Sequence, residues 1–459
     1  MEWTKLLNSN RPEEKTGGYN ITSDGRSEYQ RDFDRIVFCS AFRRLQDKTQ
    51  VFPLPETDFV HTRLTHSLEV SVVGRSLGNL AGEKILARHT DLKKEFSNFD
   101  FGEIVAAASL AHDIGNPPFG HSGEDAIAEY FLRGNGSAFE SKIKDRKKWS
   151  DLIKFEGNAQ GFRILTKLQN PLLRGGLRLT FATLASLTKY PNESFFYNSP
   201  AKHLSESYRK FGFFQAEKEL FREIADATGL LNRATDKDDY CWCRHPLAFL
   251  VEAADDICYR IMDLEDGFRL GLVTFDETEQ LLASIIKNKK FRNYQERDEE
   301  NKIGYLRAKA IGELVREIAE VFISNEENLL SGKFDSALIS QISSSDILEE
   351  IMNLSVKKIY RYESVIEREA AGFEVLAGLL DIYIEAINEL ATGHLSARNK
   401  TIVGLLPEQF IGTNKLPEAD LYERLLRILD YVSGMTDSFA VSIFRKMRGI
   451  SLPGGRINF

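Results

Sequence analysis

The chain has 459 residues and a formal net charge of −8 at pH 7, and 42% of its residues are hydrophobic while 28% are charged. These proportions exclude a globally disordered chain, and the length predicts about two or three domains. The mildly acidic charge argues against a surface coated with positive charge for nucleic acid, and leaves only a local basic cleft open.

The N-terminal stretch 1–18 has no continuous apolar segment of signal-peptide length, and nowhere do about 18 uncharged apolar residues follow one another. We therefore expect a protein that is neither exported nor membrane-spanning. Four cysteines are too few for a disulfide framework, and the pair Cys241 and Cys243 lacks the second pair that a zinc site of this kind needs. The sequence thus predicts a cytoplasmic protein.

Large apolar residues recur every three or four positions along most of the chain, which is the spacing of one helix face. In chain order, this spacing predicts helices over 67–85, 101–113, 246–266 and 372–390. The strict alternation that is typical of half-buried strands is scarce. We therefore predict an all-α fold.

Two stretches between these helices are expected to be connections. Residues 134–150 are rich in glycine and then in lysine, which favours a surface connection whose charges form a solvated helix face rather than a nucleic-acid patch. Around 191–210, Pro191, Pro200 and several aromatic residues predict a long irregular segment.

The segment 110–126, LAHDIGNPPFGHSGEDA, gathers histidines and acids around a turn. His112 and Asp113 end a predicted apolar helix, and the glycine and prolines that follow should stop it. Imidazole with carboxylate suits borderline divalent cations, but adjacent side chains on a regular helix point about 100° apart. A lone His-Asp pair is therefore a weak signal, since surface or capping chemistry explains most such pairs.

Two further segments strengthen the prediction of a metal site. His66 starts a predicted helix whose apolar face continues through Val70, so its side chain should point inward. Asp255, Tyr259 and Asp263 are four residues apart and hence lie on one helix face among apolar residues. Buried acids are costly without a cation or hydrogen-bond donors, which favours a site over capped polar residues of the core.

These motifs resemble the HD-domain phosphohydrolases, whose metal ligands are a histidine, a His-Asp pair and a later aspartate. Six ordered motifs resemble the deoxyguanosine triphosphate triphosphohydrolase (dGTPase) branch over most of residues 28–270: RRLQDKTQVFPL, RLTHSLEV, AHDIGNPPFGHSGEDA, FEGNAQGFRIL, LTKYP and EAADDICYRIMDLED. The C-terminal region matches loosely, through EREAAGFEVLAGLLD and DYVSGMTDSFA. Six motifs in order are far more specific than the His-Asp pair alone.

The resemblance implies one divalent metal held by His66, His112, Asp113 and Asp255. Asp255 is preferred to its neighbour Asp256 because the family has an aspartate, tyrosine, aspartate series at this spacing. We expect manganese or magnesium, with iron, cobalt or zinc as alternatives, because two imidazoles and two carboxylates accept several ions.

Members of this family hydrolyse a deoxynucleoside triphosphate to the deoxynucleoside and inorganic triphosphate. The resemblance therefore implies hydrolysis of dGTP, with other dNTPs as further candidates, and a part in controlling dNTP pools. Attack on the α-phosphorus needs a cation beside its oxygens and a proton donor for the departing 5′ oxygen. His121, beyond the rigid turn, is the expected catalytic group, oriented by Glu124. The sequence leaves open whether His121 is a base, an acid or a nucleophile.

The resemblance also assigns residues to the substrate. Phosphate contacts are expected from Arg63, Lys189, Tyr190 and Lys210. Gln50 and Asp263 are expected to bond the 3′ hydroxyl of the deoxyribose, while the Tyr259 ring fills the place of a 2′ hydroxyl. Asn158 resembles a further site residue without an assigned partner. No local motif identifies the base.

By this resemblance the chain divides into an N-terminal segment, an HD-domain helical core with an insertion around 134–245, and a C-terminal helical region that completes the pocket and forms oligomer contacts. The expected bounds are 1–27, 28–275 and 276–459. A homo-oligomer is expected, with a hexamer as one candidate state. Single-stranded DNA is left open as a partner, and no membrane contact is expected.

Three other functions were weighed against dGTP hydrolysis. One is a broader dNTPase that nucleotides activate at an allosteric site, which assays of single and mixed dNTPs would distinguish. Another is an HD-type phosphohydrolase of nucleoside monophosphates, cyclic nucleotides or guanosine polyphosphates, which would release no inorganic triphosphate. A nucleotide or single-strand DNA sensor is disfavoured because the metal, histidine and lysine motifs are all present.

Overall fold

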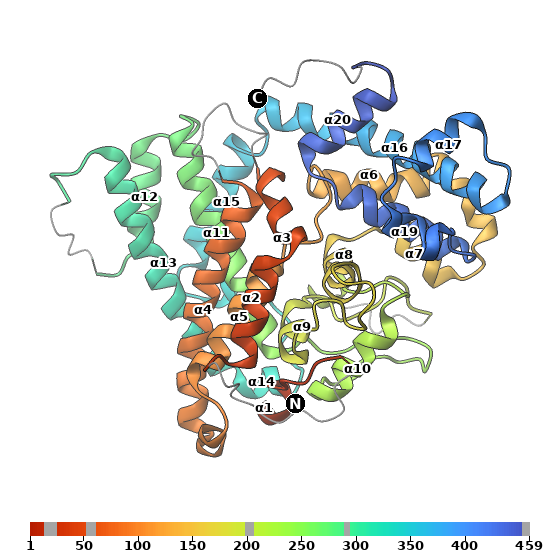
Figure 1. Cartoon of the computed structure of the whole chain (residues 1–459). Coiled ribbons are helices and arrows are strands. Elements are labelled where there is room, and N and C mark those ends of the chain that lie inside the picture. The colour runs from red at the N-terminus through yellow and green to blue at the C-terminus, as the bar shows by residue number, and fades with distance from the viewer. Residues whose placement is uncertain (13–24, 52–60, 198–205, 289–293, 452–459) are drawn as a thin grey trace.

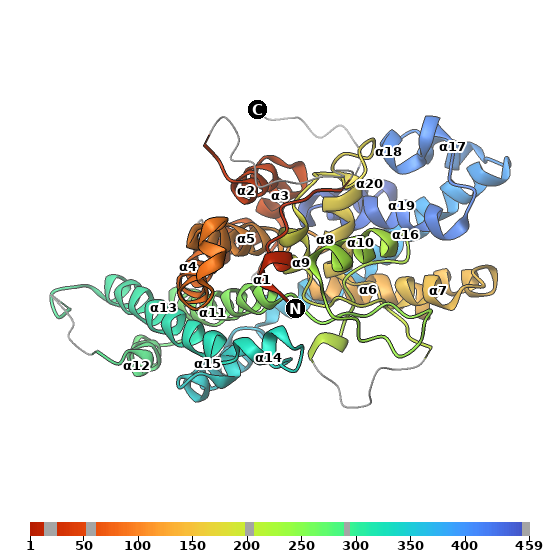
Figure 2. The ribbon, with the colours of Figure 1, turned by 90° about the horizontal axis from the view of Figure 1, so that it is seen from below.

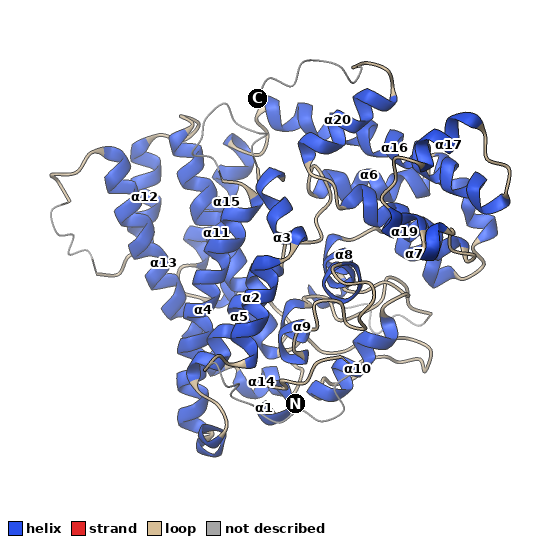
Figure 3. Ribbon diagram, in the orientation of Figure 1, coloured by secondary structure: helices blue, strands red, loops and turns tan. Residues whose placement is uncertain are grey.

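The computed structural model describes residues 1–12, 25–51, 61–197, 206–288 and 294–451. Within these ranges every regular element is a helix, and strand-like pairing is confined to three isolated bridges (Figure 3). The prediction of an all-α fold is therefore confirmed. In the same ranges, no helix combines the length and the apolar composition that a bilayer crossing requires.

The helices follow one another along the whole described chain. The first ten are α1 (Trp3–Leu6), α2 (Glu28–Phe38), α3 (Ser40–Arg44), α4 (Arg63–Arg88), α5 (Asn98–Ala111), α6 (His121–Leu132), α7 (Arg146–Ile153), α8 (Gly157–Arg163), α9 (Phe181–Leu187) and α10 (Lys218–Thr228). The others are α11 (Pro246–Arg269), α12 (Phe275–Ile285), α13 (Glu299–Ser324), α14 (Glu326–Leu330), α15 (Ser345–Lys358), α16 (Glu363–Thr392), α17 (Ala397–Val403), α18 (Glu408–Ile411), α19 (Leu421–Ser433) and α20 (Asp437–Met447). Short tighter or wider turns are η1 (Leu45–Asp47), η2 (Thr90–Lys94), η3 (Asn135–Lys142), η4 (Ile164–Leu168), η5 (Glu206–Tyr208), η6 (Leu338–Gln341) and η7 (Thr413–Lys415).

The helices that apolar spacing predicts are present. The predicted ranges correspond to α4, α5, α11 and α16, in that order. The irregular segment predicted around 191–210 contains only the short turn η5 among its described residues, while residues 198–205 lie outside the described part of the chain.

The connection predicted over 134–150 is largely helical and partly buried. It contains η3 and the start of α7, whose N-cap Asp145 accepts a hydrogen bond from the backbone N–H of Lys147. Lys147 is only 5% exposed, and its ammonium pairs with Glu193 and, at 3.0 Å, with Asp239. The expectation of a solvated charged face is therefore wrong at this lysine, because two buried carboxylates replace the water around it.

One group of helices, on the left in Figure 1 and again in the view from below in Figure 2, comprises α2, α4, α5, α11, α13 and α15. At its centre α4 and α5 approach closely, because Gly74, Gly78 and Gly82 form a stripe along α4. A Cβ atom at Gly78 would lie 2.6 Å from the carbonyl oxygen of Phe101. Any larger side chain would push the helices apart, so the start of α4 is held against the end of α5.

A second group, on the right in Figure 1, comprises α6, α7, α16, α17, α19 and α20. Its hydrophobic core is separate from that of the first group. On α16, buried residues recur at helical spacing: Leu376, Leu379, Leu380, Tyr383 and Ile387. This spacing turns one apolar stripe of α16 toward α6, α19 and α20, which explains why the helix packs there.

The two groups do not divide where the sequence places a boundary between 275 and 276. Helices α13 and α15 follow that position yet pack in the first group, whereas α6 precedes it and packs on α16. The chain passes from the first group to the second between α5 and α6. The ranges 1–27, 28–275 and 276–459 stay a prediction as functional regions.

A buried ion pair joins α8, whose Phe162 lies in the core of the first group, to α19 of the second group. The guanidinium of Arg163, at the end of α8, donates to both carboxylate oxygens of Asp430 in α19 at 2.8 and 2.9 Å. Both side chains are 1% exposed, and Arg163 also contacts Glu217. Because burial removes water from both charges, loss of either partner would leave the other uncompensated.

We therefore expect Asp430→Ala to lower the free energy of unfolding by about 3 kcal/mol or more. The measurement is equilibrium unfolding in urea. The control is Glu385→Ala, which removes a carboxylate paired with Arg398 where both side chains are more than half exposed. That change should cost less than about 1 kcal/mol. Equal losses in the two variants would contradict a special role for the buried pair.

Candidate functional site

Three helices of the first group bring polar side chains to one place. His66 lies in the first turn of α4, behind a capping box that fixes where this helix begins. α5 ends at Ala111, so His112 and Asp113 lie just beyond its last turn. Asp255 comes from the middle of α11, which packs against both other helices. The close contact of α4 with α5 thus places the sequence-predicted ligands side by side.

The ligand atoms of these residues form a compact cluster. Donor atoms of His66, His112 and Asp113 all lie within 4.8 Å of one another. The Oδ1 atom of Asp255 lies 3.0 Å from Nε2 of His66 and 3.5 Å from Nε2 of His112. Two imidazoles and two carboxylates converging in this way fit a divalent cation.

The ring orientation of His112 also fits a metal ligand. Its Nδ1 lies 2.7 Å from the carbonyl oxygen of Ser109. Because a carbonyl oxygen only accepts hydrogen bonds, Nδ1 must carry a proton and donate it. The Nε2 atom is then the ring nitrogen that faces Asp113 and Asp255. Burial lowers the pKa of His112, but the two carboxylates outweigh it and raise that pKa to about 9. The same negative field would attract a cation in place of the proton.

Asp113 is held ionised by its surroundings. Arg63 donates to its Oδ2 at 2.6 Å and Asn116 donates to its Oδ1 at 2.5 Å. Burial raises the pKa of Asp113, but the charges of Arg63 and His112 more than offset this and lower it to about 2. Arg63 therefore contacts the metal-binding carboxylate directly, although the sequence assigns it to phosphate.

The neighbouring acids Asp255 and Asp256 have opposite environments. Burial disfavours the charged form of Asp255, but His112 and His66 outweigh it and hold its pKa well below the usual range. Burial of Asp256 beside Glu252 raises its pKa to about 7, because Arg260 and Lys189 only partly offset that effect. The geometry therefore favours Asp255, the residue chosen from the sequence, as the fourth ligand.

The predicted catalytic histidine lies across a turn from this cluster. His121 is the first residue of α6, and its Nδ1 lies 2.8 Å from Oε2 of Glu124. The other oxygen of Glu124 accepts the backbone N–H of Gly157 at 2.7 Å, which fixes the carboxylate. The bond from Glu124 raises the pKa of His121. The side chain of His121 is 78% exposed, so its imidazole is oriented by Glu124 and yet accessible to a ligand.

A cavity of about 230 Å³ joins the cluster to His121. Of the residues proposed from the sequence, it is lined by His112, Asp113, His121, Asn158, Lys189, Tyr190, Lys210 and Asp255. Three further predicted residues do not line the cavity but contact residues that do: His66 contacts Asp255, Arg63 contacts Asp113, and Glu124 contacts His121. Residues from motifs far apart in sequence therefore share one cavity.

Two lysines of the cavity are already paired with acids. Lys189 lies 3.0 Å from Glu252, and this charge outweighs burial to raise the pKa of the lysine. Lys210 lies 3.0 Å from Glu156 and 3.4 Å from Glu124. Both lysine side chains are about one-third exposed and line the cavity, so they are open to an anion there.

The residues expected around a sugar lie farther along α11. The ring of Tyr259 stacks on Tyr360 at 5.6 Å, and the Tyr360 hydroxyl donates to Oδ2 of Asp263 at 2.7 Å. Burial raises the pKa of Asp263 to about 8. Oε1 of Gln50 is buried without a hydrogen-bond partner among the described residues. Tyr259, Asp263 and Gln50 do not line the 230 Å³ cavity.

Several neighbours of the site were not predicted. Asn116 and Glu252 line the cavity, and Glu156 holds Lys210. Asn116 lies inside the recognised turn motif, and Glu252 lies three residues before Asp255 on one helix, so spacing was an available signal for both. Tyr360 lies in a region without a recognised motif, and only the fold brings it to Asp263.

Comparison with known families finds two matches in the chain. Residues 63–168 match the HD domain, and residues 343–446 match the phosphohydrolase-associated domain. The first range contains three of the four candidate ligands together with His121. The phosphohydrolase-associated match contains α16, α17, α19 and almost all of α20, which are the C-terminal helices of the second group.

Curated relatives match along nearly the whole chain. A deoxyguanosinetriphosphate triphosphohydrolase-like protein of Synechocystis sp. is 44% identical, covering 98% of this chain and 100% of that protein. One of Pseudomonas aeruginosa is 40% identical, covering 99% and 100%. A deoxyguanosinetriphosphate triphosphohydrolase of Klebsiella pneumoniae is 32% identical, covering 92% and 94%.

The ligand cluster makes a direct prediction about Asp255. We expect Asp255→Ala to weaken Mn²⁺ binding by more than the 10- to 100-fold that is typical of losing an outer partner, because a ligand atom itself is lost. Bound metal is measured by elemental analysis after dialysis at fixed Mn²⁺ concentrations. The adjacent variant Asp256→Ala is the matched control and should keep its metal. Equal metal contents in both variants would rule out this assignment.

Proposed function

The chain belongs to the deoxyguanosinetriphosphate triphosphohydrolase family of HD-domain proteins, and on this premise we propose that it hydrolyses dGTP to deoxyguanosine and inorganic triphosphate. The family makes it a metal-dependent phosphohydrolase. One observation carries the choice of reaction: a single cavity joins the metal-ligand cluster, an oriented histidine and two lysines. These are the groups that hydrolysis at a polyphosphate requires.

The balance of charges supports a polyanionic substrate. Lys189 and Lys210 face the cavity, each already matched to an acid. A triphosphate brings about four negative charges, so it needs these lysines together with the positive charge of a cation. Arg63 supports Asp113 at 2.6 Å, and we propose that its guanidinium also reaches phosphate, as the family resemblance implies. Tyr190, between the lysines on the cavity wall, is the fourth proposed contact.

We propose that His66, His112, Asp113 and Asp255 hold one divalent cation, manganese or magnesium. When bound, such a cation supplies positive charge to the oxygens of the reacting phosphate. The protein's part is to keep both carboxylates ionised and to present Nε2 of His112, through Arg63 and the carbonyl of Ser109.

His121 is the proposed proton-transfer group. Hydrolysis adds water to the α-phosphorus, breaks the bond to O5′ and leaves a proton on that oxygen. Glu124 bonds Nδ1 of His121, so Nε2 is the atom that can exchange a proton with the reactants. The hydrogen bond to Glu124 also raises the pKa of His121, which favours the protonated imidazole. Gly157 fixes Glu124 and hence the ring.

The deoxyribose is proposed to lie along α11 beyond Asp255. Tyr259 and Asp263 follow Asp255 by one and two helical turns, so a sugar attached to a phosphate at the metal would pass them. Asp263 and Gln50 would bond the 3′ hydroxyl, and Asn158 lines the cavity on the phosphate side. The stack of Tyr259 on Tyr360 holds the ring in place where a 2′ hydroxyl would otherwise fit.

The remaining expectations belong to this proposal. A nucleotide substrate and four cysteines without disulfides are consistent with a cytoplasmic enzyme. A homo-oligomer, for which a hexamer is one candidate, is proposed from the family resemblance, and single-stranded DNA is left as a partner to be tested.

Product separation tests the reaction. With Mn²⁺ and dGTP we expect deoxyguanosine and inorganic triphosphate in equal amounts. His121→Ala should keep its metal but lose turnover by about 100-fold or more, the usual scale for a positioned acid or base. His394→Ala removes an exposed histidine elsewhere and is the control. Release of dGMP, dGDP or monophosphate would contradict the proposal, and activity that appears only in dNTP mixtures would favour an allosteric dNTPase.

Sugar selection tests Tyr259. Tyr259→Ala should lower kcat/KM for dGTP and narrow the dGTP to GTP ratio, because a 2′ hydroxyl then has room and water. An unpaired buried hydroxyl costs about 1 to 3 kcal/mol, so the ratio should fall by roughly 5- to 100-fold. Tyr259→Phe keeps the ring and should keep the ratio. If the alanine variant retains the wild-type ratio, the sugar is selected elsewhere.

A further inference from the structure

The turn between the metal cluster and His121 has an unusual backbone. Residues 114–120 connect the end of α5 to the start of α6. Within it, Phe119 and Gly120 both have positive φ, at 67° and 63°. Glycine adopts this conformation freely, but a bulky residue such as phenylalanine does so only when its surroundings impose it. Something outside the turn must therefore hold Phe119.

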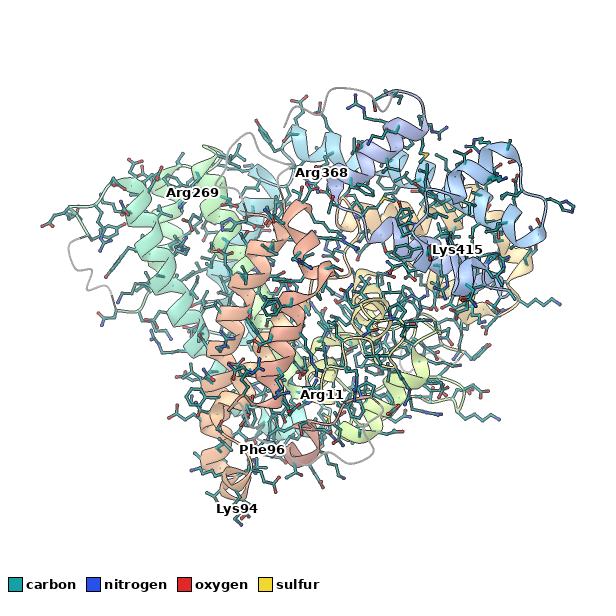
Figure 4. All side chains as sticks on the ribbon, in the orientation of Figure 1. Arg11, Lys94, Phe96, Arg269, Arg368 and Lys415 are labelled. Carbon is teal, nitrogen blue, oxygen red and sulfur yellow. The ribbon has the colours of Figure 1, made fainter. Side chains whose placement is uncertain are left out.

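The carboxylate of Asp437 contacts the backbone of this turn. Oδ1 of Asp437 accepts the N–H of Phe119 at 3.0 Å, and Oδ2 accepts the N–H of Thr49 at 3.2 Å. Arg368 of α16 lies 3.3 Å from Oδ2; it is labelled near the top of Figure 4. Asp437 is 5% exposed and begins α20. One buried carboxylate thus joins α16 and α20 to the turn and to the residue before Gln50.

Packing acts at the same point. The ring of Phe119 is buried in the hydrophobic core of the second helix group, which also contains Leu376 and Ala440. A Cβ atom at Gly372 of α16 would lie 3.0 Å from Cγ of Phe119, so the absence of a side chain there makes room for the ring. The N–H bond and the ring contact both draw Phe119 toward the second group.

Lys48 restrains the other end of the turn. Its ammonium donates to the carbonyl oxygens of Asn116 at 2.5 Å and of Ser433 at 3.0 Å. Asn116 in turn donates to Asp113 of the ligand cluster. The turn is therefore attached to the metal side at Asn116 and to the second group at Phe119, with His121 two residues beyond.

We propose that Asp437 is a positioning residue, which holds Phe119 in its left-handed conformation and thereby sets the place of His121 relative to the metal ligands. This inference rests on the proposed function, since it assigns His121 to the reaction. Asp437 does not line the cavity, and its carboxylate contacts the turn only at the backbone N–H of Phe119. In this view, the phosphohydrolase-associated region, residues 343–446, supplies the surface on which the catalytic turn is shaped.

The decisive variant is Asp437→Asn, which keeps the size but replaces one accepting oxygen by an amide that donates. We expect kcat for dGTP to fall roughly 10- to 100-fold, the scale for displacing a reacting group by about 1 Å. KM and bound Mn²⁺ should change less than about threefold, because the ligands and lysines are untouched. A merely structural role would not produce this split.

A neighbouring variant controls for damage to α20. Thr436 is the N-cap of this helix, and its hydroxyl accepts the N–H of Phe439 at 3.3 Å without contacting the turn. Thr436→Ala should lower the melting temperature but leave kcat within about twofold. If Asp437→Asn fails to fold, Asp437→Glu replaces it, because it keeps the charge while moving both oxygens, and the same loss of kcat is expected.

A double-variant cycle tests whether Asp437 acts through His121. In the His121→Ala background, Asp437→Asn should reduce the residual rate by less than about twofold, because the group it positions is already absent. Full multiplication of the two losses would overturn the proposal. So would a kcat in Asp437→Asn that matches Thr436→Ala.

Hydrogen exchange keeps this inference separate from the choice of substrate. Without nucleotide, the Phe119 amide should exchange faster in Asp437→Asn than in wild type or Thr436→Ala, because a single remaining oxygen must serve the N–H groups of both Phe119 and Thr49. Unchanged exchange would overturn the proposal even if the enzyme is active. If the Phe119 amide exchanges faster in Asp437→Asn but the wild-type enzyme releases no inorganic triphosphate, the positioning role of Asp437 is supported and the proposed reaction is rejected.

Discussion

The site depends on two carboxylates buried in one place. Asp113 and Asp255 lie beside two histidines, and burial by itself would protonate both acids. Arg63 offsets that penalty for Asp113, and His66 and His112 offset it for Asp255. The arrangement keeps a concentrated negative charge that a divalent cation can occupy, while the arginine remains within the same cluster to meet phosphate.

The distance across the site depends on how two helix groups meet. The candidate metal ligands belong to the first group, whereas His121 starts a helix of the second. The seven-residue turn between them is held at Asn116 and at Phe119, and the buried pair of Arg163 with Asp430 fastens the groups nearby. Contacts from a region distant in sequence therefore hold the turn that precedes His121.

The two lysines of the cavity wall form ion pairs with neighbouring acids. Lys189 is matched by Glu252, which Arg244 also contacts at 2.7 Å, and Lys210 is matched by Glu156. These pairs keep the lysines charged and in place before an anion arrives. Under the proposed function, a bound triphosphate would exchange one anionic partner of each lysine for another, so little reorganisation of the wall would be needed.

The sequence by itself determined the helical class, because apolar spacing records local structure, and its ordered motifs named eight of the residues that line the cavity. It also favoured Asp255 over Asp256 as a ligand, through the family's aspartate, tyrosine, aspartate series at this spacing. Only the tertiary structure decided that Lys147 is buried, that the Tyr360 hydroxyl donates to Asp263, and that the N–H of Phe119 donates to Asp437. Each of these contacts joins segments more than 40 residues apart, where no local period or motif carries information about which side chains meet.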